Sequence, residues 1–403
     1  MALKQSLSKP SLIGDVIMME NCKINIRLKS SIMTPFHSDT LWGHICWALR
    51  YMKSEDALNK FLKAYEAGQP PLIISNAFPI GYLPYPVLPP IEKEKAMALI
   101  KKFWGDDLFT GLSVLKRLLK AKYISKRILE EQEEISNELL VEKILGEPCI
   151  CPKIAGYLPD SCFFKRRDKD RNNRYICGFL SNSEENCPLD YKAEMAKMRE
   201  ELSVTYHSKI SRLSGITYDG SLFTTQDTFF GSEEFEAYCK VGNGFTKEEL
   251  TDCLEFISMD GYGGKKSTGK GSIECRLEND DMENLPSDAN AFMTLSNYVP
   301  SAEDPTKGYY RSFTKYGKLG GHFASSPLTP GSDPMPFKYP LIMFEAGSIF
   351  KRGKVMNYGR IVHGMHAIKE PEAIKEPEIV HYGLAYPFPL RVSKEIEAGW
   401  GYE

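Results

Sequence analysis

Apolar and polar residues alternate along several stretches of the chain, and this alternation predicts its strands. Residues 22–29 read CKINIRLK and alternate with a period of two, which predicts a strand with one buried face. Residues 202–208 and 272–277 alternate in the same way. Residues 71–78 and 235–241 are rich in apolar side chains and are also predicted strands.

Helical spacing of apolar residues appears between these strands. One helix is predicted after residue 37, with Ser38 or Asp39 as its N-cap, and its apolar stripe is Leu41, Ile45, Ala48, Leu49 and Met52. A second helix begins with the capping-box pair Thr246 and Glu249, and its apolar side is Leu250, Cys253, Leu254 and Ile257. Residues 92–145 hold three charged, amphipathic helical stretches, which indicate an insertion rather than part of a sheet.

Without this insertion, the elements follow the order strand, helix, strand, and then strand, helix, strand again. This order is typical of a ferredoxin-like or RRM-like unit, whose sheet can present one face to RNA. We therefore expect a first domain at residues 11–283, with an insertion at about residues 92–200. An acidic linker at 278–284 leads to a second domain, 284–403, in which strand-like stretches dominate: 291–298, 315–326, 341–351 and 385–392. The expected fold class is α+β.

Composition narrows the classes of function. Of the 403 residues 42% are hydrophobic, enough for sizeable cores, and no apolar run reaches the roughly 18 residues of a membrane span. Residues 1–10 lack the apolar core of a signal peptide and the ten cysteines are scattered, so we expect a cytoplasmic protein with reduced thiols. The net charge of −2 means that any nucleic-acid site must be a local basic patch.

Residues 260–272, DGYGGKKSTGKGS, are the strongest candidate for a binding site. Glycines adopt positive φ and let another backbone approach closely, and unpaired N–H groups in such a loop form an anion site. The loop offers glycines, lysines and hydroxyls: Gly261, Gly263, Gly264, Gly269, Gly271, Lys265, Lys266, Lys270, Ser267 and Thr268. We expect it to contact phosphates, although a solvated turn is the simpler alternative for an isolated loop of this composition.

The order of elements argues against a P-loop. Here a helix precedes the loop and a strand follows it, whereas a P-loop needs a strand first and a helix afterwards. Gly264 and Gly269 also have the wrong spacing, and Gly271 stands where Ser or Thr should be. A polynucleotide backbone is therefore a better source of phosphates than a nucleoside triphosphate.

A second candidate lies at the start of the first predicted helix. His37 and Ser38 stand where N–H groups and the helix dipole favour an anion, so we expect them to contact phosphate or base. Asp39 is interpreted as a cap. The role of His44, further along the same helix, stays open.

A third candidate lies at the end of the 202–208 strand. His207, Lys209 and Arg212 are expected to meet RNA there, and the Arg212 guanidinium can hold a phosphate through two hydrogen bonds. Ordinary charges of an edge strand are the alternative. Tyr218 and Phe223 follow, for which stacking on bases and core packing are both open.

The cysteines at 149–187 form a weak zinc pattern. Cys149 and Cys151 are one residue apart, and long gaps separate them from Cys162, Cys177 and Cys187, unlike the usual pairs of zinc ligands. We expect thiols without metal, and no cofactor.

Taken in order, these features resemble RAMP-superfamily CRISPR proteins. The N-terminal part of the resemblance consists of a strand leading to residues 36–47 (FHSDTLWGHICW), the strand end at 206–212 (YHSKISR) and the glycine loop. The C-terminal part is similar to the Csm-type subunit that caps the crRNA 5′ end in type III-A effector complexes, through 294–300 (TLSNYVP), 316–321 (YGKLGG), 345–350 (EAGSIF) and 381–388 (HYGLAYPF). The insertion is not covered.

This resemblance implies a function in antiviral defence. It implies two ferredoxin-like domains and binding of crRNA at its 5′ repeat-derived tag. It also implies contacts with the large polymerase-like signalling subunit and with the backbone RAMP subunit of the Csm complex. The family subunit binds RNA without cutting it, so no catalytic residue is expected, and residues 147–205 are the candidate for a thumb that kinks the crRNA beside the tag.

An enzyme of the same superfamily is the alternative. Some members cleave CRISPR-repeat RNA without metal, by acid–base chemistry. His37 or His44 could then serve as a general base near a lysine. Against this reading, no second histidine or tyrosine is obviously paired with either residue in the sequence.

Overall fold

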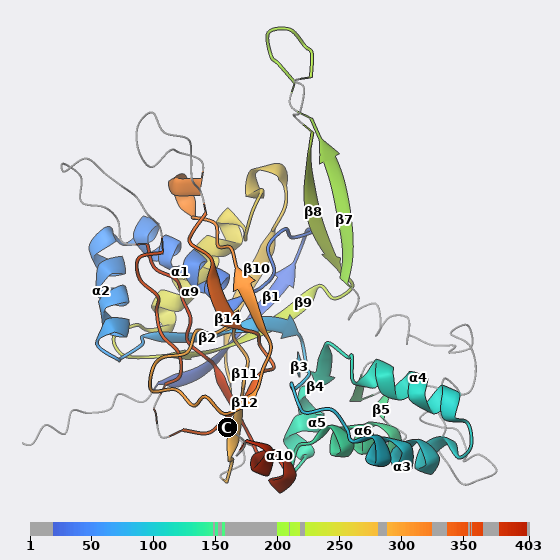
Figure 1. Ribbon diagram of the computed structural model, residues 1–403. Helices are drawn as coiled ribbons and strands as arrows, with labels where there is room; N and C mark the ends of the chain where they lie inside the picture. Colours follow the sequence, from blue (N-terminus) through green and yellow to red (C-terminus); the bar gives the residue numbers. More distant parts are fainter. Residues whose placement is uncertain are drawn as a thin grey trace, which may run out of the picture.

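The computed structural model describes residues 19–147, 150–151, 155–157, 200–208, 210–217, 222–280, 288–324, 337–353, 355, 357–365 and 379–400. Helices and antiparallel sheets occur together in this part of the chain, which confirms the α+β class. Figure 1 shows a central body, a group of helices at one side of it, and a long hairpin that projects from it.

The first sheet has the strand order β10-β1-β9-β2, and all neighbouring strands are antiparallel. Its strands are β1 (Glu20–Leu28), β2 (Leu72–Pro79), β9 (Glu234–Val241) and β10 (Ile273–Asn279). The predicted alternation is confirmed in β1, where Cys22, Ile24 and Ile26 are buried and the residues between them are partly exposed. All four predicted strands of this sheet are thus confirmed.

Two helices connect strands of this sheet and pack on each other, α1 (Ser38–Met52) and α9 (Lys247–Asp260). The capping box of Thr246 and Glu249 forms as predicted. The predicted cap of α1 is wrong, because His37 occupies the N-cap position and Ser38 is already the first helical residue. Met52 is also exposed, since the apolar stripe ends at Leu49, and α2 (Glu55–Glu66) follows.

The insertion contains four described helices instead of the predicted three. They are α3 (Lys93–Trp104), α4 (Leu108–Leu118), α5 (Lys126–Glu131) and α6 (Asn137–Gly146). The short pair β3 (Tyr82–Pro84) and β4 (Tyr123–Ser125) joins them to the body, and β5 (Ile150–Cys151) pairs with β6 (Gly156–Tyr157). The helices lie beside the central sheet and not on its faces (Figure 1).

The projecting hairpin consists of β7 (Glu200–His207) and β8 (Phe223–Phe230). The 202–208 strand is therefore confirmed, but it pairs outside the first sheet. Leu202, Val204 and Tyr206 alternate along β7 and are exposed, so this side of the hairpin packs against nothing in the described chain. The residues at 210–217 form the far tip (Figure 1).

The C-terminal half forms a second antiparallel sheet of order β12-β15-β11-β16. Its strands are β11 (Ala291–Thr294), β12 (Gly308–Tyr309), β15 (Ile349–Lys351) and β16 (Pro387–Leu390). A separate pair joins β13 (Ser312–Lys315) to β14 (Leu341–Phe344), so the predicted stretch 341–351 is two strands. The stretch predicted at 315–326 is not a strand beyond Lys315 and contains the 3-10 turn η4 (Gly321–Ala324); α10 (Lys394–Gly399) closes the described chain.

The two halves share one hydrophobic core. Polar groups cross the same boundary, because the Asn76 amide donates to Asn297 Oδ1 at 3.2 Å and the Ile74 N–H donates to Tyr382 Oη at 2.9 Å. Buried polar contacts of this kind fix the orientation of the halves. Among the described residues, no helix has both the length and the hydropathy required to cross a bilayer.

Candidate nucleic-acid interface

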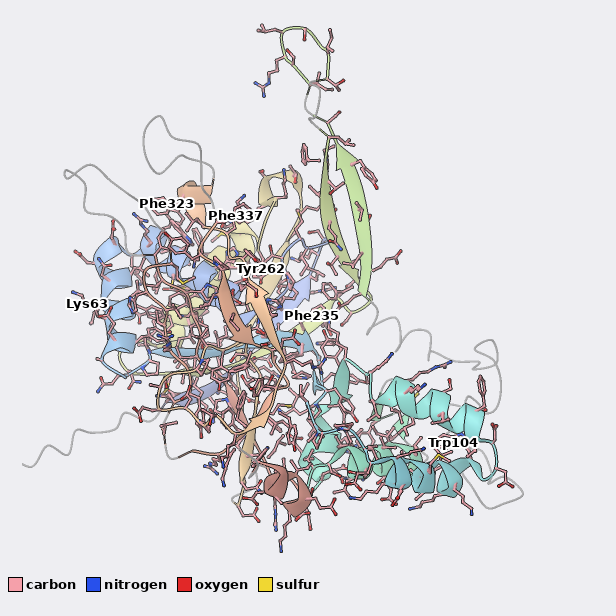
Figure 2. All side chains as sticks on the ribbon, viewed as in Figure 1. Lys63, Trp104, Phe235, Tyr262, Phe323 and Phe337 are labelled. Atoms are coloured by element: carbon pink, nitrogen blue, oxygen red, sulfur yellow. The ribbon has the colours of Figure 1, made fainter. Side chains whose placement is uncertain are left out.

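Tyr262 anchors the glycine loop in the body of the protein. Its side chain is fully buried and its hydroxyl donates to the Pro35 carbonyl at 2.6 Å. The ring lies 4.9 Å from the rings of both Phe36 and His44. Figure 2 shows Tyr262 within the body and not at its surface. The loop is therefore held against the segment that leads into α1, where His37 was predicted to bind RNA.

Most backbone N–H groups of the loop already have acceptors within the protein. The Gly263 N–H donates to His44 Nε2 at 2.9 Å, and the Gly264 N–H donates to Thr34 Oγ1 at 3.3 Å. The Gly271 N–H donates to the Ser31 carbonyl. An anion site built from these N–H groups would compete with internal acceptors, so exposed side chains are the better candidates for contact with phosphate.

His44, whose role the sequence left open, acts as this internal acceptor. Burial, together with the nearby Lys266 ammonium, lowers its pKa to about 4. The imidazole is therefore neutral near pH 7 and keeps a free lone pair on Nε2 for the Gly263 N–H. Its bond helps to hold the loop on α1.

Two glycines of the loop stand where a side chain would not fit. Gly271 has a φ of +70°, and a Cβ at this position would lie 1.9 Å from the Tyr262 carbonyl oxygen. Gly263 has a φ of +74°, and its Cβ would lie 2.8 Å from the Thr34 side chain. Only glycine fits both the backbone angle and the space at these two positions.

The three lysines of the loop differ in their partners. Lys266 pairs with Asp260. Lys270 Nζ lies 2.8 Å from Asp227 Oδ2 on β8 and donates to Ser31 Oγ at 3.2 Å. Lys265 is exposed, makes no ion pair among the described residues, and its Nζ lies 5.9 Å from the centre of the Phe223 ring. Lys265 is thus the loop cation most available to a phosphate, beside the exposed Ser267.

The inner side of the hairpin contributes the next two residues. The His207 ring stacks on the Phe223 ring with 5.0 Å between centroids and 20° between planes, and His207 Nε2 lies 2.8 Å from Thr225 Oγ1. The Lys265 ammonium approaches the same Phe223 ring. A cation from the loop and two rings from the hairpin therefore form one surface, which joins candidates more than fifty residues apart in sequence.

Two predicted residues, Arg212 and Gly261, are not part of this surface. Arg212 is exposed and belongs to the segment 210–217, which lies at the hairpin tip, away from the glycine loop (Figure 1). Lys209 lies outside the described residues, as does Tyr218. Gly261 is buried at the C-terminus of α9, where its N–H donates to the Ile257 carbonyl.

At the start of α1, the two predicted residues differ in exposure. Ser38 is fully buried; its N–H donates to Asn76 Oδ1 at 2.8 Å and its hydroxyl lies 3.5 Å from the Asn297 carbonyl. These contacts favour a role in joining the halves over contact with RNA. His37 is partly exposed, and Lys315 Nζ donates to its Nδ1 at 3.1 Å. Burial and the Lys315 charge lower the pKa of His37 to about 4.

Asp39 is the centre of a buried ionic cluster and not a cap. Its Oδ2 lies 2.9 Å from Lys315 Nζ and 3.6 Å from His381 Nε2. Burial alone would raise the pKa of Asp39, but the Lys315 ammonium and then His381 lower it to about 2. Burial also lowers the pKa of Lys338 to about 8, close to this cluster.

Sequence reasoning missed these partners from the C-terminal half. Lys315 and Lys338 lie in stretches with no motif of their own, although His381 begins one of the stretches that carry the resemblance. Exposed rings also accompany them, at Tyr316 and Phe337. No local signal links residues 315 and 39, because only the tertiary fold brings them together.

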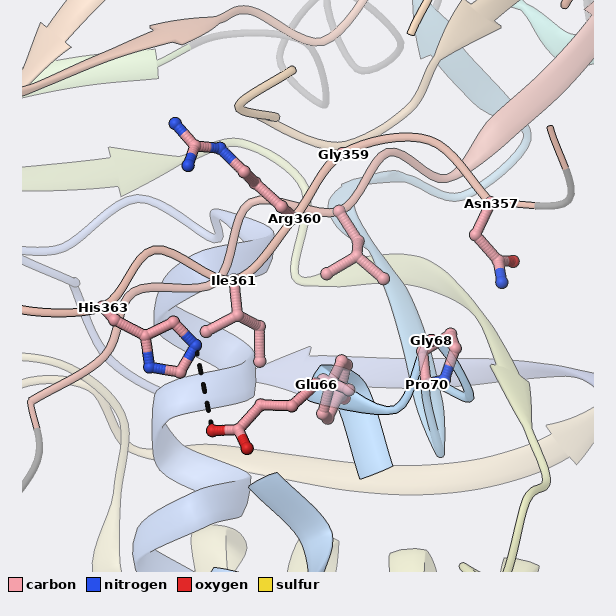
Figure 3. A pocket seen from close by; sticks show the side chains of 10 residues that line it. Glu66, Gly68, Pro70, Asn357, Gly359, Arg360, Ile361 and His363 are labelled. Atoms are coloured by element: carbon pink, nitrogen blue, oxygen red, sulfur yellow. Dashed lines mark ion pairs between the residues drawn. The ribbon is translucent and has the colours of Figure 1, made fainter. Parts of the chain in front are cut away.

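A pocket of about 430 Å³ lies elsewhere, between the end of α2 and the segment 357–363. Figure 3 shows Glu66 and His363 facing each other across it, with Glu66 Oε1 and His363 Nε2 4.0 Å apart. None of the predicted site residues lines this pocket.

No group of three or more potential metal ligands occurs within the described ranges. Of the five cysteines considered for zinc, Cys151 is buried and the other four lie outside those ranges.

No protein-family model and no curated protein matches the sequence. Three solved structures illustrate what the fold is similar to. A chain of a Csm3–Csm4 subcomplex of a type III-A CRISPR–Cas interference complex has 13% identity and a TM-score of 0.49, over 92% of this chain and 99% of that one. A chain of a Csm1–Csm4 cassette in complex with cA4 has 16% identity and a TM-score of 0.45, over 93% and 99%. A chain of a type III-B Cmr-beta complex has 11% identity and a TM-score of 0.36, over 82% and 86%. The structural neighbours are thus Csm and Cmr chains of type III CRISPR complexes.

Proposed function

We propose that this chain is a non-catalytic crRNA-binding subunit of a type III-A CRISPR effector complex, which holds the 5′ repeat-derived tag. The observation that carries the proposal is the convergence of the glycine loop, the segment before α1 and the inner side of the hairpin. Tyr262 holds the loop on Pro35, and Lys270 holds it on Asp227. The loop and the hairpin, which were separate RNA-binding candidates, thereby share one surface, and the segment before α1 supports the loop from inside.

This surface has the chemistry that single-stranded RNA requires. Lys265 supplies a cation that makes no ion pair in the described chain and can bind a phosphate, and Phe223 and His207 supply rings on which a base can stack. Binding should depend on a few local charges, because the net charge of the chain is only −2.

The projecting hairpin is the element that we assign to the thumb. Residues 200–205 of β7 belong to the range expected for it, 147–205, and β8 completes the hairpin outside that range. The glycine loop contacts the hairpin at Asp227, in the middle of β8, and the hairpin carries exposed apolar side chains along β7. Such an element can reach past the tag and kink the RNA beside it.

The partners and the finer fold belong to the same proposal. We expect contacts with the large polymerase-like signalling subunit and with the backbone RAMP subunit; the similar solved structures contain Csm4 together with Csm1 or with Csm3. We also propose two ferredoxin-like domains. The order β10-β1-β9-β2 with α1 and α9 as connections supports this for the first half. The shared core supports a fixed arrangement of both halves.

One observation favours the nuclease alternative. His37 has a neutral imidazole beside a lysine ammonium, which is a pairing that metal-independent acid–base cleavage of RNA can use. Lys315 is also bound to Asp39, however, and its ammonium donates to the ring nitrogen that would accept a proton. The pair is therefore better suited to hold the segment before α1 in place.

The test compares binding and cleavage in EDTA. Labelled CRISPR-repeat RNA, with and without the 5′ tag sequence, is incubated with the wild-type chain and with a His37→Ala variant. Tag-dependent binding of intact RNA supports the proposal. Cleavage of the repeat by the wild type that is lost in His37→Ala overturns it and establishes the nuclease.

A further inference from the structure

The outer side of α4 in the helical insertion exposes large apolar side chains. Phe109 is 86% exposed, and Leu108 and Leu112, which lie one helical turn apart, are 42% and 41% exposed. Three exposed apolar residues within five positions form a contiguous patch and not a scattered set. This part of the insertion lies outside the stretches that resemble the CRISPR family.

Packing within the described part of the insertion does not account for this patch, because the inner side of α4 is already filled. Leu115 and Leu118 are buried there. A Cβ on Gly111 would lie 2.5 Å from Ile100 Cγ2, so α4 lies close to α3 along this line. The helix cannot turn its outer side inward without losing these contacts, and the patch is presented in one fixed orientation.

Positively charged residues follow the apolar patch on the exposed side of α4, toward its C-terminal end. Lys116, Arg117 and Lys120 are exposed and have no ion-pair partner among the described residues. The stretch 108–120 contains no carboxylate. Elsewhere in the insertion, cations pair with acids, as in Lys102–Glu142 and Arg127–Glu131. The outer side of α4 thus combines an apolar patch with positive charge that no described carboxylate neutralises.

We propose that this surface docks an acidic segment of another protein subunit, whose apolar side chains cover Phe109 and Leu112 and whose carboxylates pair with Lys116 and Arg117. RNA fits less well, because Asp106 and Asp107 precede Phe109 and place negative charge at the end that would stack a base. Two leucines beside Phe109 also offer no flat face for stacking. The partner belongs to the effector complex, so this inference rests on the proposed function.

Photo-crosslinking in the intact complex tests the proposal. Phe109 is replaced by the photoreactive p-benzoylphenylalanine, and the complex is purified from cells through a tag on this chain. Met259, which is 81% exposed on α9, carries the same replacement as the matched control. Crosslinked products are identified by mass spectrometry. The Phe109 position is expected to crosslink to one subunit at a segment rich in Asp and Glu, and the Met259 position is not.

Charge reversal supplies the second readout. Lys116→Glu with Arg117→Glu should reduce that crosslink by about tenfold or more, since both cations lose their carboxylate partners. Lys60→Glu with Lys63→Glu on α2, at the other side of the body (Lys63 in Figure 2), should leave it unchanged. A crosslink to RNA, a yield no higher than at Met259, or insensitivity to the charge reversal overturns the proposal. If no complex is recovered with the wild-type chain, the proposed function itself fails.

Discussion

Lys270 and Asp227 join the glycine loop to the projecting hairpin. The ammonium of Lys270 lies 2.8 Å from a carboxylate that is only 4% exposed, while the lysine side chain is 30% exposed. The other oxygen of Asp227 is buried without a hydrogen-bond partner in the described chain. This carboxylate therefore depends on Lys270, and the pair ties β8 to the glycine loop.

Lys270→Ala should lower the free energy of unfolding by roughly 1–3 kcal/mol, because it leaves the Asp227 charge buried and unpaired. Lys265→Ala is the matched control from the same loop and should change stability by less than about 0.5 kcal/mol, as its ammonium is exposed. Urea denaturation measures both. The double change Lys270→Ala with Asp227→Asn should recover part of the loss, and equal stabilities of the two single variants would contradict the role of this pair.

Lys265→Ala should instead weaken RNA binding. Removing one phosphate contact lowers the slope of log K against log salt by about one. Fluorescence anisotropy at several salt concentrations gives this slope. Lys60→Ala provides the control, since Lys60 is exposed on α2, which lies on the opposite side of the body from the hairpin (Figure 1). An unchanged slope for Lys265→Ala would remove this residue from the interface.

Two glycines of the loop should differ sharply in their tolerance of alanine. Gly271→Ala places a Cβ 1.9 Å from the Tyr262 carbonyl oxygen at positive φ, so we expect a loss of about 3 kcal/mol or more. Gly269 has a φ of +81° but open space around its Cβ position, so Gly269→Ala should cost only about 1 kcal/mol of backbone strain. Thermal unfolding compares them, and similar melting temperatures would show that the close approach is absent.

Stability should fall as the pH decreases from about 7 to about 5. Burial lowers the pKa of His381 from 6.5 to about 4. The Asp39 charge opposes this shift, and the Lys338 and Lys315 charges add to it. Between these values the unfolded chain binds a proton that the folded chain does not, at a cost of up to about 1.4 kcal/mol per pH unit. His37 and His44 act in the same direction.

Urea denaturation at several pH values measures how the free energy of unfolding changes with pH. His381→Gln should make this change less steep. The lowered pKa of Asp39 adds a separate loss of stability only below about pH 4, because that contribution is complete above the ordinary pKa of 3.8. A stability that stays constant from pH 7 to pH 5 would contradict the burial of neutral histidines.

Local patterns predicted the elements well because their causes are local. The alternation at 22–29 and the capping box of Thr246 and Glu249 are complete within a few residues, and both form as expected. The cap of α1 was mispredicted because tertiary contacts use both candidate residues. The Ser38 N–H donates to Asn76 on β2, and Asp39 forms an ion pair with Lys315 on β13. Asp39, a residue type that often caps helices, thus links the two halves instead.

The candidate site was predicted in outline. The loop was singled out by its glycines and lysines, but the neutralisation of Lys270 depends on Asp227, more than forty residues earlier in the chain. Two of the loop N–H groups that were expected to bind phosphate donate to His44 and Thr34 instead. The spacing of residues in the sequence does not predict these contacts. The proximity of Lys265 to the Phe223 ring could not be predicted either, because it depends on how the hairpin lies against the loop.

The most direct measurement of the central claim is crosslinking from the RNA side. The effector complex is purified with a crRNA that carries 4-thiouridine in its 5′ tag, and the crosslinked peptides of this chain are identified. The proposed function predicts crosslinks to the hairpin at 200–230 and to the glycine loop at 261–271, and their loss when the label is moved to the 3′ end. Crosslinks of the tag to other subunits alone would contradict it.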